Sequence, residues 1–347
     1  MALDQTRPVR HLRQAGHFPQ MGGIMQITDF GKTDFGAAVQ RVSIAAGDLT
    51  AKILTLGCTL QTLHLNGIPH SLTLGSDTLS DYAGKLLYFG ALVGPVANRI
   101  TSAQTTLNGA TLRFDPNENG NLLHGGSIGL HHKIWTIANV TADSVTLTLT
   151  LPDGEYGWPG TRQVSATFRI VPPATLQLQI TATTDADTLI NIANHSYWNL
   201  DGTPHWQGHS LQIVADHTLP VDEALLPTGE IAPVADTPFD FRMGRVLTSG
   251  QPPLDTNFCL SDAKTPLRDA ATLTGASGVS MTLATTEPGL QVYDAQRTAR
   301  PHKTPYEGIA IEAQGWPDAP NHANFPSVKI TSDQPYAQTT EWSFSKP

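Results

Sequence analysis

The sequence predicts an all-β protein, built as a large antiparallel β-sandwich with few short helices. Three observations lead to this prediction. Hydrophobic and polar residues alternate along much of the chain, turn residues separate the alternating segments, and persuasive amphipathic helical patterns are scarce. Alternation with a period of two puts hydrophobic side chains on one face of a strand and polar side chains on the other, which is typical of half-buried antiparallel strands.

The clearest alternating segments are rich in threonine. In "SVTLTLTL" (144–151), hydrophobic residues stand at every second position from 145 to 151, with Ser and Thr between them. In "ATLQLQITA", positions 176, 178 and 180 repeat the pattern, and "LTAKILTLGCTLQTLHLNG" (49–67) has a similar texture. Each segment is therefore expected to form strands with one buried face.

Turn residues recur between these segments. They include "LNG" at 65–67 and 107–109, "PDG" at 152–154, and "PP" at 172–173 and 252–253. Such clusters connect strands because Gly, Asn, Asp and Pro adopt the backbone angles of tight turns. The stretch "SDTLSDYAG" (76–84) is the one place where we expect a short turn of helix.

The domain organisation is expected to be simple. A chain of 347 residues suits one large all-β domain. Residues 25–347 contain no strong linker, charge run or clear internal repeat, so we expect them to form a single β-sandwich domain. Residues 1–24 are polar and aperiodic, which predicts a flexible N-terminal extension, with Met25 as an alternative start.

Charge and cysteine content argue against several partners and compartments. The chain has 21 Lys and Arg against 30 Asp and Glu, a net charge of −9, and no basic cluster that would indicate nucleic acid. No apolar run approaches the ~20 residues of a membrane span, and the N-terminus lacks the apolar core of a secretory signal. The two cysteines, Cys58 and Cys259, are typical of a reducing compartment. We therefore expect a cytoplasmic protein that binds neither membrane nor nucleic acid.

No cofactor and no metal are expected. The chain has no Gly-rich phosphate loop, no dinucleotide fingerprint and no G-x-S-x-G elbow. His131 and His132 are adjacent, so on a strand they would point to opposite faces. His205 and His209 have i,i+4 spacing but lie among Pro and Gly, and no Cys/His pair has zinc spacing.

Polar residues that could take part in binding or catalysis occur in six short stretches. The first, "GPVANRI" (94–100), holds Asn98 and Arg99. Arg99 is either a surface arginine paired with a carboxylate or a planar fork that donates hydrogen bonds to substrate oxygens. The second, "NENGNLLHGGSIGLHHKIW", holds His124, and the two glycines after it leave room beside the imidazole.

The third stretch, "NIANHSYWNL" (191–200), is strand-like and unusually polar. It places His195 beside Ser196 and Tyr197. On its own, this histidine is either one more buried polar residue or a proton donor.

The last three stretches carry acids and an amide. "LDTNFCL" holds Asp255, and "GLQVYDAQ" places Gln291 on an expected strand. In "GIAIEAQGWPDAPNHANFPSVKI", Glu312 follows a small apolar run at an expected strand end. Desolvation there would raise the pKa of the carboxyl, whereas the alternative is a glutamate that caps the strand or pairs with an arginine.

Taken together, these side chains suit a polyhydroxylated ligand. Carboxylates and amides form hydrogen bonds with the many hydroxyls of a sugar, and Trp and Tyr pack against its C–H faces. A histidine and a glutamate on opposite sides of such a ligand allow general acid–base chemistry.

The six stretches and their neighbours resemble the aldose 1-epimerases, also called galactose mutarotases. The resemblance covers most of the chain and follows an ordered series of motifs: "MQITDFG", "ANRI", "NLLHGG", "NHSYWNL", "LLPTGEIAPVADTPFDFR", "LDTNF", "PGLQVYDAQ" and "IEAQGWPDAPNHANFPS". The resemblance implies a large antiparallel supersandwich, which agrees with the alternation. It implies a small-molecule aldose such as galactose or glucose as substrate, no cofactor, and a monomer or homodimer.

The resemblance also implies roles for individual residues. His195 matches the general acid of the family and Glu312 its general base, so we expect an ionised Glu312 and a charged His195 in the resting state. The implied substrate contacts are Asn98, Arg99, His124, Ser196, Tyr197, Asp255 and Gln291.

The chain departs from the family pattern at two places. Pro95 stands where the family usually has the first arginine of "GRxANRI". Leu130, His131 and His132 stand in place of the usual Gly-Phe-Asp that precedes Lys133. Neither change removes the acid or the base, but both are expected to bear on sugar preference through the rim of the pocket.

Three rival functions use the same residues differently. An epimerase of hexose 6-phosphates needs a cationic pocket, and Arg99 is the one arginine in a site motif. A glycoside hydrolase would use Asp255 and Glu312 as a carboxylate pair. A non-catalytic sugar-binding protein would not need both His195 and Glu312.

Overall fold

The structure, a computed structural model, describes residues 25–347. The flexible extension predicted for residues 1–24 lies outside the described residues. Within them, strands dominate, as the alternation predicted, and the longest helix has four residues. The helices are α1 (Leu79–Tyr82), η1 (Thr101–Ala103), η2 (Gly126–Ile128), η3 (Leu130–His132), η4 (Glu155–Gly157) and η5 (Ala319–Asn321). The short helix expected in "SDTLSDYAG" is α1.

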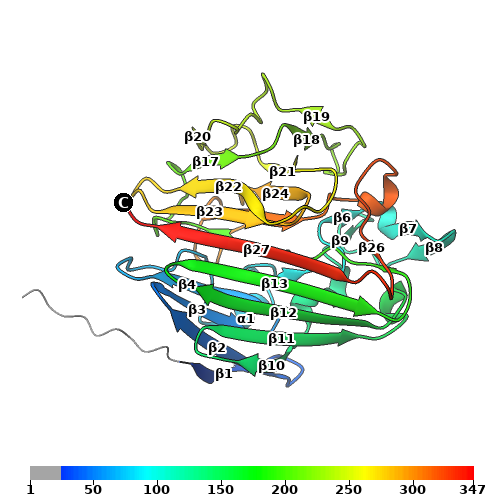
Figure 1. Ribbon diagram of the computed structural model, residues 1–347, viewed down its shortest axis with the longest axis horizontal. Coiled ribbons are helices and arrows are strands. Elements are labelled where there is room, and N and C mark those ends of the chain that lie inside the picture. The colour runs from blue at the N-terminus through cyan, green and yellow to red at the C-terminus, as the bar shows by residue number, and fades with distance from the viewer. Residues whose placement is uncertain (1–24) are drawn as a thin grey trace, which may run out of the picture.

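The largest sheet has nine antiparallel strands, which Figure 1 shows stacked from β10 at the bottom to β20 at the top. In spatial order they are β10 (Thr136–Val140), β11 (Ser144–Leu151), β12 (Arg162–Val171), β13 (Thr175–Thr184), β27 (Tyr336–Ser345), β23 (Ser280–Thr285), β22 (Arg268–Thr274), β17 (Ser210–Ile213) and β20 (Arg245–Val246). The C-terminal strand β27 lies between β13 and β23, so it joins two segments that are far apart in the sequence.

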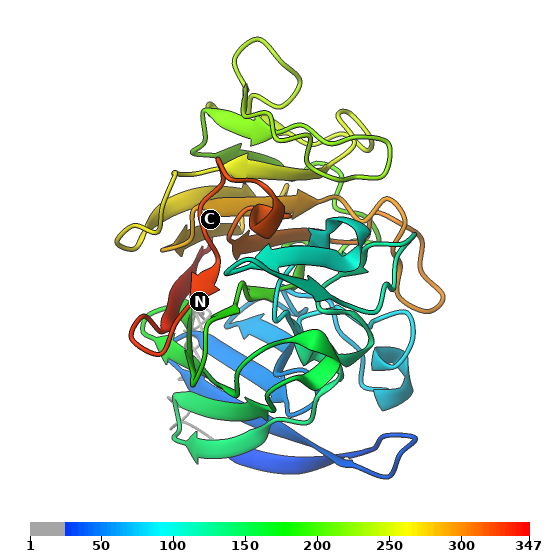
Figure 2. The ribbon, with the colours of Figure 1, turned by 90° about the vertical axis from the view of Figure 1, so that its right-hand side faces the viewer.

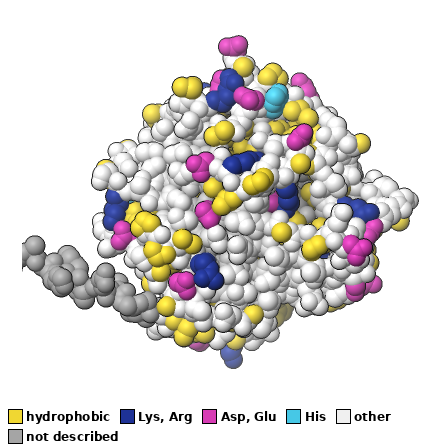
Figure 3. Space-filling view, in the orientation of Figure 1, with side chains coloured by type: hydrophobic (Ala, Val, Ile, Leu, Met, Phe, Trp, Pro, Cys, Tyr) yellow, Lys and Arg dark blue, Asp and Glu magenta, His cyan; other side chains and the backbone are white. Residues whose placement is uncertain are grey.

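The predicted alternation appears directly in the burial of this sheet. On β11 the hydrophobic residues at 145, 147 and 151 are buried and Leu149 is half-buried, while Thr150 is exposed. On β13, the residues at 176, 178 and 180 are buried as well. The outward face carries mostly uncharged polar side chains, and the charged side chains on the face seen in Figure 3 are scattered.

Two smaller sheets complete the main architecture, and Figure 2 shows the strands in successive layers. The four-stranded sheet consists of β1 (Gln26–Lys32), β2 (Ala38–Ala46), β3 (Leu49–Leu54) and β4 (Thr59–Leu65). The six-stranded sheet runs in the order β16 (Tyr197–Trp198), β25 (Ile309–Gln314), β24 (Gly289–Tyr293), β21 (Asp255–Cys259), β18 (His217–Leu219) and β19 (Ala232–Pro233).

Short two-stranded pairs connect these sheets. They are β14 (Thr188–Leu189) with β26 (Lys329–Ile330), β15 (Ala193–Asn194) with β5 (Leu92–Val93), β6 (Arg99–Ile100) with β9 (Leu122–Leu123), and β7 (Gln104–Leu107) with β8 (Ala110–Arg113). The β7–β8 hairpin turns at Asn108 and Gly109, both with positive φ, as the "LNG" signal predicted.

The main apolar core draws on all three large sheets. Its buried side chains begin at Val42 on β2 and end at Phe344 on β27, with Phe168 and Trp198 among those that are fully buried. A continuous core of this kind is what we expect of the single domain predicted for residues 25–347, which stays a prediction.

Candidate active site

Three neighbouring strands of the six-stranded sheet bring acids and amides together. In the register of β21, β24 and β25, Asn257 lies opposite Gln291, and Gln291 lies opposite Glu312. Directly paired residues share a face of the sheet, and so do residues two apart on one strand, so Asp255 lies on this face too. Three motifs that are separate in the sequence therefore meet on one surface.

Glu312 lies inside a strand rather than at its end. β25 runs from Ile309 to Gln314, and all six of its residues are buried. The sequence-based expectation of a strand-end carboxylate was therefore wrong in position, because the pairing of β25 with β24 continues as far as Gln314. The expected desolvation is nevertheless present, since Glu312 is 2% exposed.

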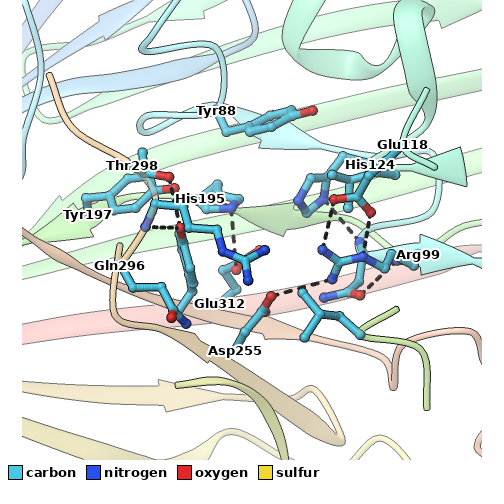
Figure 4. Close-up of a pocket in the computed structure, with 15 residues that line it drawn as sticks. Tyr88, Arg99, Glu118, His124, His195, Tyr197, Asp255, Gln296, Thr298 and Glu312 are labelled. Atoms are coloured by element: carbon cyan, nitrogen blue, oxygen red, sulfur yellow. Dashed lines mark hydrogen bonds and ion pairs between the residues drawn. The ribbon is translucent and has the colours of Figure 1, made fainter. Parts of the chain in front are cut away.

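These residues line a cavity of about 250 Å³ (Figure 4). Its walls are formed by Tyr88, Asn98, Arg99, Glu118, Leu123, His124, His195, Tyr197, Leu225, Asp255, Tyr293, Gln296, Arg297, Thr298 and Glu312. The list includes all the predicted site residues except two, Ser196 and Gln291.

Ser196 and Gln291 do not line the cavity, although both adjoin residues that do. The rings of His195 and Tyr197 stack with centroids 5.0 Å apart, so they face the same way. Ser196 stands between them in the chain, outside any strand, and it is buried. Gln291 acts through a neighbour, because its Nε2 donates a hydrogen bond of 2.7 Å to Oδ1 of Asp255.

His195 and Glu312 face each other across the cavity floor. Nε2 of His195 lies 3.6 Å from Oε1 of Glu312, and both side chains are almost fully buried. Nδ1 of His195 and Oε2 of Glu312 have no hydrogen-bond partner within the described protein. Both residues line the cavity, and each has a buried polar atom without a partner.

Burial shifts the pKa values of this pair in opposite directions. It raises the pKa of Glu312 well above its ordinary value; the charge of Asp255 raises it further, while Arg99 lowers it. It lowers the pKa of His195 to about 4. These directions oppose the ionised Glu312 and charged His195 expected for the resting state, because both side chains are desolvated.

The number of protons on the pair is the same in either arrangement. A protonated Glu312 beside a neutral His195 carries one proton, and so does an ionised Glu312 beside a charged His195. The raised pKa of Glu312 and the lowered pKa of His195 thus both favour a pair that holds one proton.

His124 is held in one tautomer by Asn98. The backbone N–H of Asn98 donates a hydrogen bond of 3.1 Å to Nδ1 of His124, and the N–H of His124 donates to the carbonyl of Asn98. Burial lowers the pKa of His124 well below its ordinary value, so the ring is neutral. Because Nδ1 accepts, the remaining proton is on Nε2, which makes that nitrogen a donor.

The backbone around this pair is strained in the way often seen at functional sites. Asn98 has φ of 61° and His124 has φ of 53°, both in the left-handed region. Asn tolerates these angles better than His does, and the mutual hydrogen bonds between the two residues hold them there.

Arg99 is paired with carboxylates, which is the first of the two alternatives that the sequence left open. Its guanidinium donates hydrogen bonds to both carboxylate oxygens of Glu118, from Nε at 2.6 Å and from Nη2 at 3.0 Å. Its Nη1 lies 3.6 Å from Oδ2 of Asp255. Figure 4 shows Arg99 between these two carboxylates on the side of the cavity that holds His124. The arginine is paired, and it also forms part of the cavity wall.

Tyr88 was not anticipated from the sequence. Its ring stacks on that of His195 at 5.7 Å and packs against those of His124 and His131 at 4.8 and 4.9 Å. In Figure 4 it lies on the side of the cavity opposite Asp255 and Glu312. Tyr88 therefore fixes the orientation of two cavity histidines from one position.

With this geometry established, comparison with known proteins gives the family. A family model described as aldose 1-epimerase matches residues 40–343. The chain belongs to the aldose 1-epimerase family. The galactose mutarotase of Rattus norvegicus is 36% identical over 327 residues, which cover 89% of this chain and 95% of that protein. The aldose 1-epimerase of Escherichia coli (strain K12) is 29% identical over 326 residues, which cover 85% and 92%.

Solved structures of aldose 1-epimerase homologues share the fold over nearly their whole length. An aldose epimerase homologue from C. elegans has a TM-score of 0.83 at 30% identity, covering 89% of this chain and 99% of its own. A galactose 1-epimerase from Lactobacillus acidophilus NCFM has a TM-score of 0.82 at 26% identity, covering 94% and 99%. The predicted family and the predicted β-sandwich are thus confirmed.

The residues at the two departures from the aldose 1-epimerase pattern do not line the cavity. Pro95 packs beside Gly125, where an added Cβ would lie 2.8 Å from the proline ring. His131 is buried against Tyr88, and neither of its ring nitrogens has a partner within the described protein. Any influence of these residues on sugar preference therefore passes through the backbone at Gly125 or the ring of Tyr88.

His124, His195 and Glu312 form a group with the spacing of metal ligands. One ligand atom of each lies within 4.8 Å of the others. This group differs from the histidine pairs that raised the metal question in the sequence. Two imidazoles and one carboxylate are a common donor set for zinc, so the absence of a metal in this member of the aldose 1-epimerase family stays a prediction.

Other sequence predictions concern compartment and partners. In the part of the chain that the structure describes, no helix combines the length and apolar character needed to cross a bilayer. Cys58 and Cys259 are both free and buried.

Proposed function

We propose that the protein is an aldose 1-epimerase, which interconverts the α and β anomers of a free aldose such as galactose or glucose. The observation that carries the proposal is the convergence of His195 and Glu312 on one cavity at 3.6 Å. The relatives named galactose mutarotase and aldose 1-epimerase support the same activity.

The proposed reaction opens and recloses the sugar ring. Glu312 takes the proton from the hydroxyl on C1 while His195 gives a proton to the ring oxygen, and the C1–O5 bond breaks. An open-chain aldehyde forms, with Glu312 protonated and His195 neutral. Rotation about C1–C2 turns the other face of the carbonyl toward O5, and reversal of both proton transfers closes the ring as the other anomer.

The bound sugar is proposed to set the starting position of the proton. Burial alone favours a protonated Glu312 and a neutral His195, which is also the state of the pair after ring opening. Sugar hydroxyls that donate hydrogen bonds to Oε2 of Glu312 favour the ionised carboxylate, which moves the proton to His195. The pair then begins the reaction in the form that ring opening requires.

The remaining residues are proposed to hold the hydroxyls away from C1 while C1 turns. His124 donates from Nε2, Arg99 donates from the face that Glu118 leaves free, and Asp255 accepts. Gln291 is proposed to orient Asp255 through the hydrogen bond described above.

Activity is expected to persist in acid down to about pH 4. The pair works with one proton, and it takes up a second only as the pH falls through the lowered pKa of His195, about 4. A histidine without this shift would lose activity below ~6.5. The kcat/KM for α-D-galactose, measured by polarimetry against the spontaneous rate at each pH, checks this; an acid limb near pH 6.5 would contradict it.

Asp255→Asn is expected to change both affinity and pH dependence. The substitution removes a carboxylate that lies beside Arg99 and is proposed to accept a hydrogen bond from the sugar. KM should rise about tenfold, because one charge-assisted hydrogen bond is lost. The charge of Asp255 also raises the pKa of Glu312, so its removal lowers that pKa. The alkaline limb of kcat/KM should therefore move to lower pH.

A matched substitution separates these effects from a general loss of charge. Asp143→Asn removes a half-exposed carboxylate that pairs with Arg169, away from the cavity. It should leave KM and the alkaline limb unchanged. An alkaline limb that stays in place in Asp255→Asn would show that Asp255 does not act on Glu312.

The direct test of the proposed function is the change in optical rotation of freshly dissolved α-D-galactose and α-D-glucose. Addition of the protein should bring each sugar to its equilibrium rotation faster than the spontaneous reaction, with a saturable dependence on sugar concentration. Saturable sugar binding without acceleration would favour a non-catalytic binding protein instead.

The compartment, the cofactor requirement and the oligomeric state are part of the same proposal. A cytoplasmic location is supported by the two free, buried cysteines. The reaction as written needs no cofactor, and a monomer or homodimer is expected from the family resemblance.

A further inference from the structure

A tight turn carries Glu118, which was not anticipated from the sequence, to the wall of the sugar cavity. The backbone N–H of Glu118 donates a hydrogen bond of 3.2 Å to the carbonyl of Asn121, and the N–H of Asn121 donates one of 2.8 Å to the carbonyl of Glu118. Between them, Asn119 and Gly120 have φ of 48° and 85°. Two consecutive positive φ values are typical of the turn that closes a two-residue hairpin. The backbone of Glu118 is therefore fixed, although its side chain is 29% exposed.

Arg99 and Asp255 carry opposite charges, and other residues hold them apart. Their side chains are largely buried, yet Nη1 of Arg99 lies 3.6 Å from Oδ2 of Asp255, which is longer than a hydrogen bond. Glu118 binds Nε and Nη2 of Arg99, as Figure 4 shows, and Gln291 binds Oδ1 of Asp255. Each charge is thus held through atoms other than the two that face each other. Opposite charges attract strongly where water is largely excluded, so Arg99 should close on Asp255 if Glu118 released it.

The separated pair suits a sugar hydroxyl. Arg99 and Asp255 both line the cavity, so Nη1 offers a donor and Oδ2 an acceptor side by side. A hydroxyl can accept from the first and donate to the second at the same time. An oxygen about 2.8 Å from each atom completes a triangle on the 3.6 Å side. A direct hydrogen bond between Arg99 and Asp255 would use both atoms, and a sugar would have to break it before binding there.

We propose that Glu118 is a positioning residue that keeps Arg99 apart from Asp255, so that one sugar hydroxyl bridges the two. The inference rests on the proposed function and adds to it a residue that acts on the sugar through Arg99. The bidentate geometry supports this role, because two parallel hydrogen bonds fix the plane of the guanidinium as well as its position. A glutamate that only neutralised Arg99 would stabilise the fold, but its effect on sugar binding would not depend on Asp255.

The first test is Glu118→Gln, which keeps the size of the side chain but removes the charge that holds Arg99. The KM for galactose, measured by polarimetry, should rise about tenfold, because one charge-assisted hydrogen bond network is lost. The kcat should fall by no more than about threefold, since the bridged hydroxyl is bound equally before and during ring opening. Glu155→Gln is the matched control. Glu155 accepts a hydrogen bond of 2.6 Å from Lys133 outside the cavity, so this variant should keep the wild-type KM.

Two further measurements separate positioning from a merely structural role. In the double variant, Glu118→Gln should raise KM by no more than about twofold above that of Asp255→Asn alone, because the bridge is already lost. The second measurement uses 2-deoxy-, 3-deoxy-, 4-deoxy- and 6-deoxy-D-galactose, with anomer exchange followed by NMR. For the sugar that lacks the bridging hydroxyl, the wild-type kcat/KM should be about tenfold below that for galactose. In Glu118→Gln this deficit should shrink to about twofold or less.

Two results would overturn the inference while the proposed function stands. One is a Glu118→Gln protein with the wild-type KM for galactose. The other is a rise in KM that is just as large in the Asp255→Asn background and leaves the deficit of every deoxy sugar unchanged, which would make Glu118 a structural partner of Arg99 alone. If the wild-type protein accelerates the mutarotation of no sugar, the proposed function itself fails, and the inference fails with it.

Discussion

Glu312→Gln is expected to lower kcat for the mutarotation of α-D-galactose by roughly 10²–10⁴, the usual contribution of a positioned general base. Glutamine keeps the size of the side chain but cannot take the proton of the C1 hydroxyl. Glu312 is 2% exposed and surrounded by buried strand residues, so a substitution of equal size is the one least disruptive to packing. The kcat is measured by polarimetry at saturating sugar.

A matched control distinguishes lost chemistry from a generally weakened fold. Glu341→Gln makes the same chemical change on β27, where Glu341 accepts a hydrogen bond from Gln177 away from the cavity. This control should keep the wild-type kcat, and both variants should retain the β-rich circular dichroism spectrum of the wild type. A Glu312→Gln protein with wild-type kcat would remove Glu312 from the role of base.

His195→Gln is expected to lower kcat by a similar factor, roughly 10²–10⁴, because glutamine cannot supply a proton to the ring oxygen. The substitution also removes a ring that stacks between Tyr88 and Tyr197. The half-exposed His205, outside the cavity, gives the matched control: His205→Gln should keep the wild-type kcat.

The double variant tests whether the pair acts as a unit. Since His195 and Glu312 share one proton in the proposed mechanism, Glu312→Gln combined with His195→Gln should be no slower than the slower single variant. A double variant whose loss equals the product of the two single losses would show that the two residues act independently.

Much of the fold could be predicted from alternation alone. The segments 144–151 and 175–184 each bury one face because hydrophobic residues occupy every second position. The order of the strands in the sheets could not be predicted, because it depends on contacts between segments far apart in the chain. The position of β27 between β13 and β23 leaves no signal in the local sequence of any of these strands.

The site residues that belong to recognisable motifs could be predicted from the sequence. The site residues contributed by other loops could not. His195, Glu312, Asp255 and Arg99 stand in motifs, and the structure brings all four to one cavity. Tyr88 stands in a stretch with no polar cluster and Arg297 just after one of the six polar stretches, and only the fold shows that both line the cavity.

The pKa shift of Glu312 could be predicted from the sequence in its direction, whereas that of His195 could not. Both shifts depend on how deeply the folded chain buries the two side chains. For Glu312, the raised pKa expected of an apolar strand agreed with the structure, although its reason was the middle of a strand rather than the end. For His195, burial lowers the pKa to about 4, against the resting charge expected for it, and a backbone hydrogen bond offsets this desolvation only in part.

The central claim is that His195 and Glu312 catalyse ring opening of a free aldose, and its most direct test is the time course of optical rotation of fresh α-D-galactose. The wild-type protein should shorten the approach to equilibrium in proportion to its concentration, and the Glu312→Gln protein at the same concentration should follow the spontaneous curve closely. A wild-type time course that coincides with the spontaneous one at every protein concentration would contradict the claim.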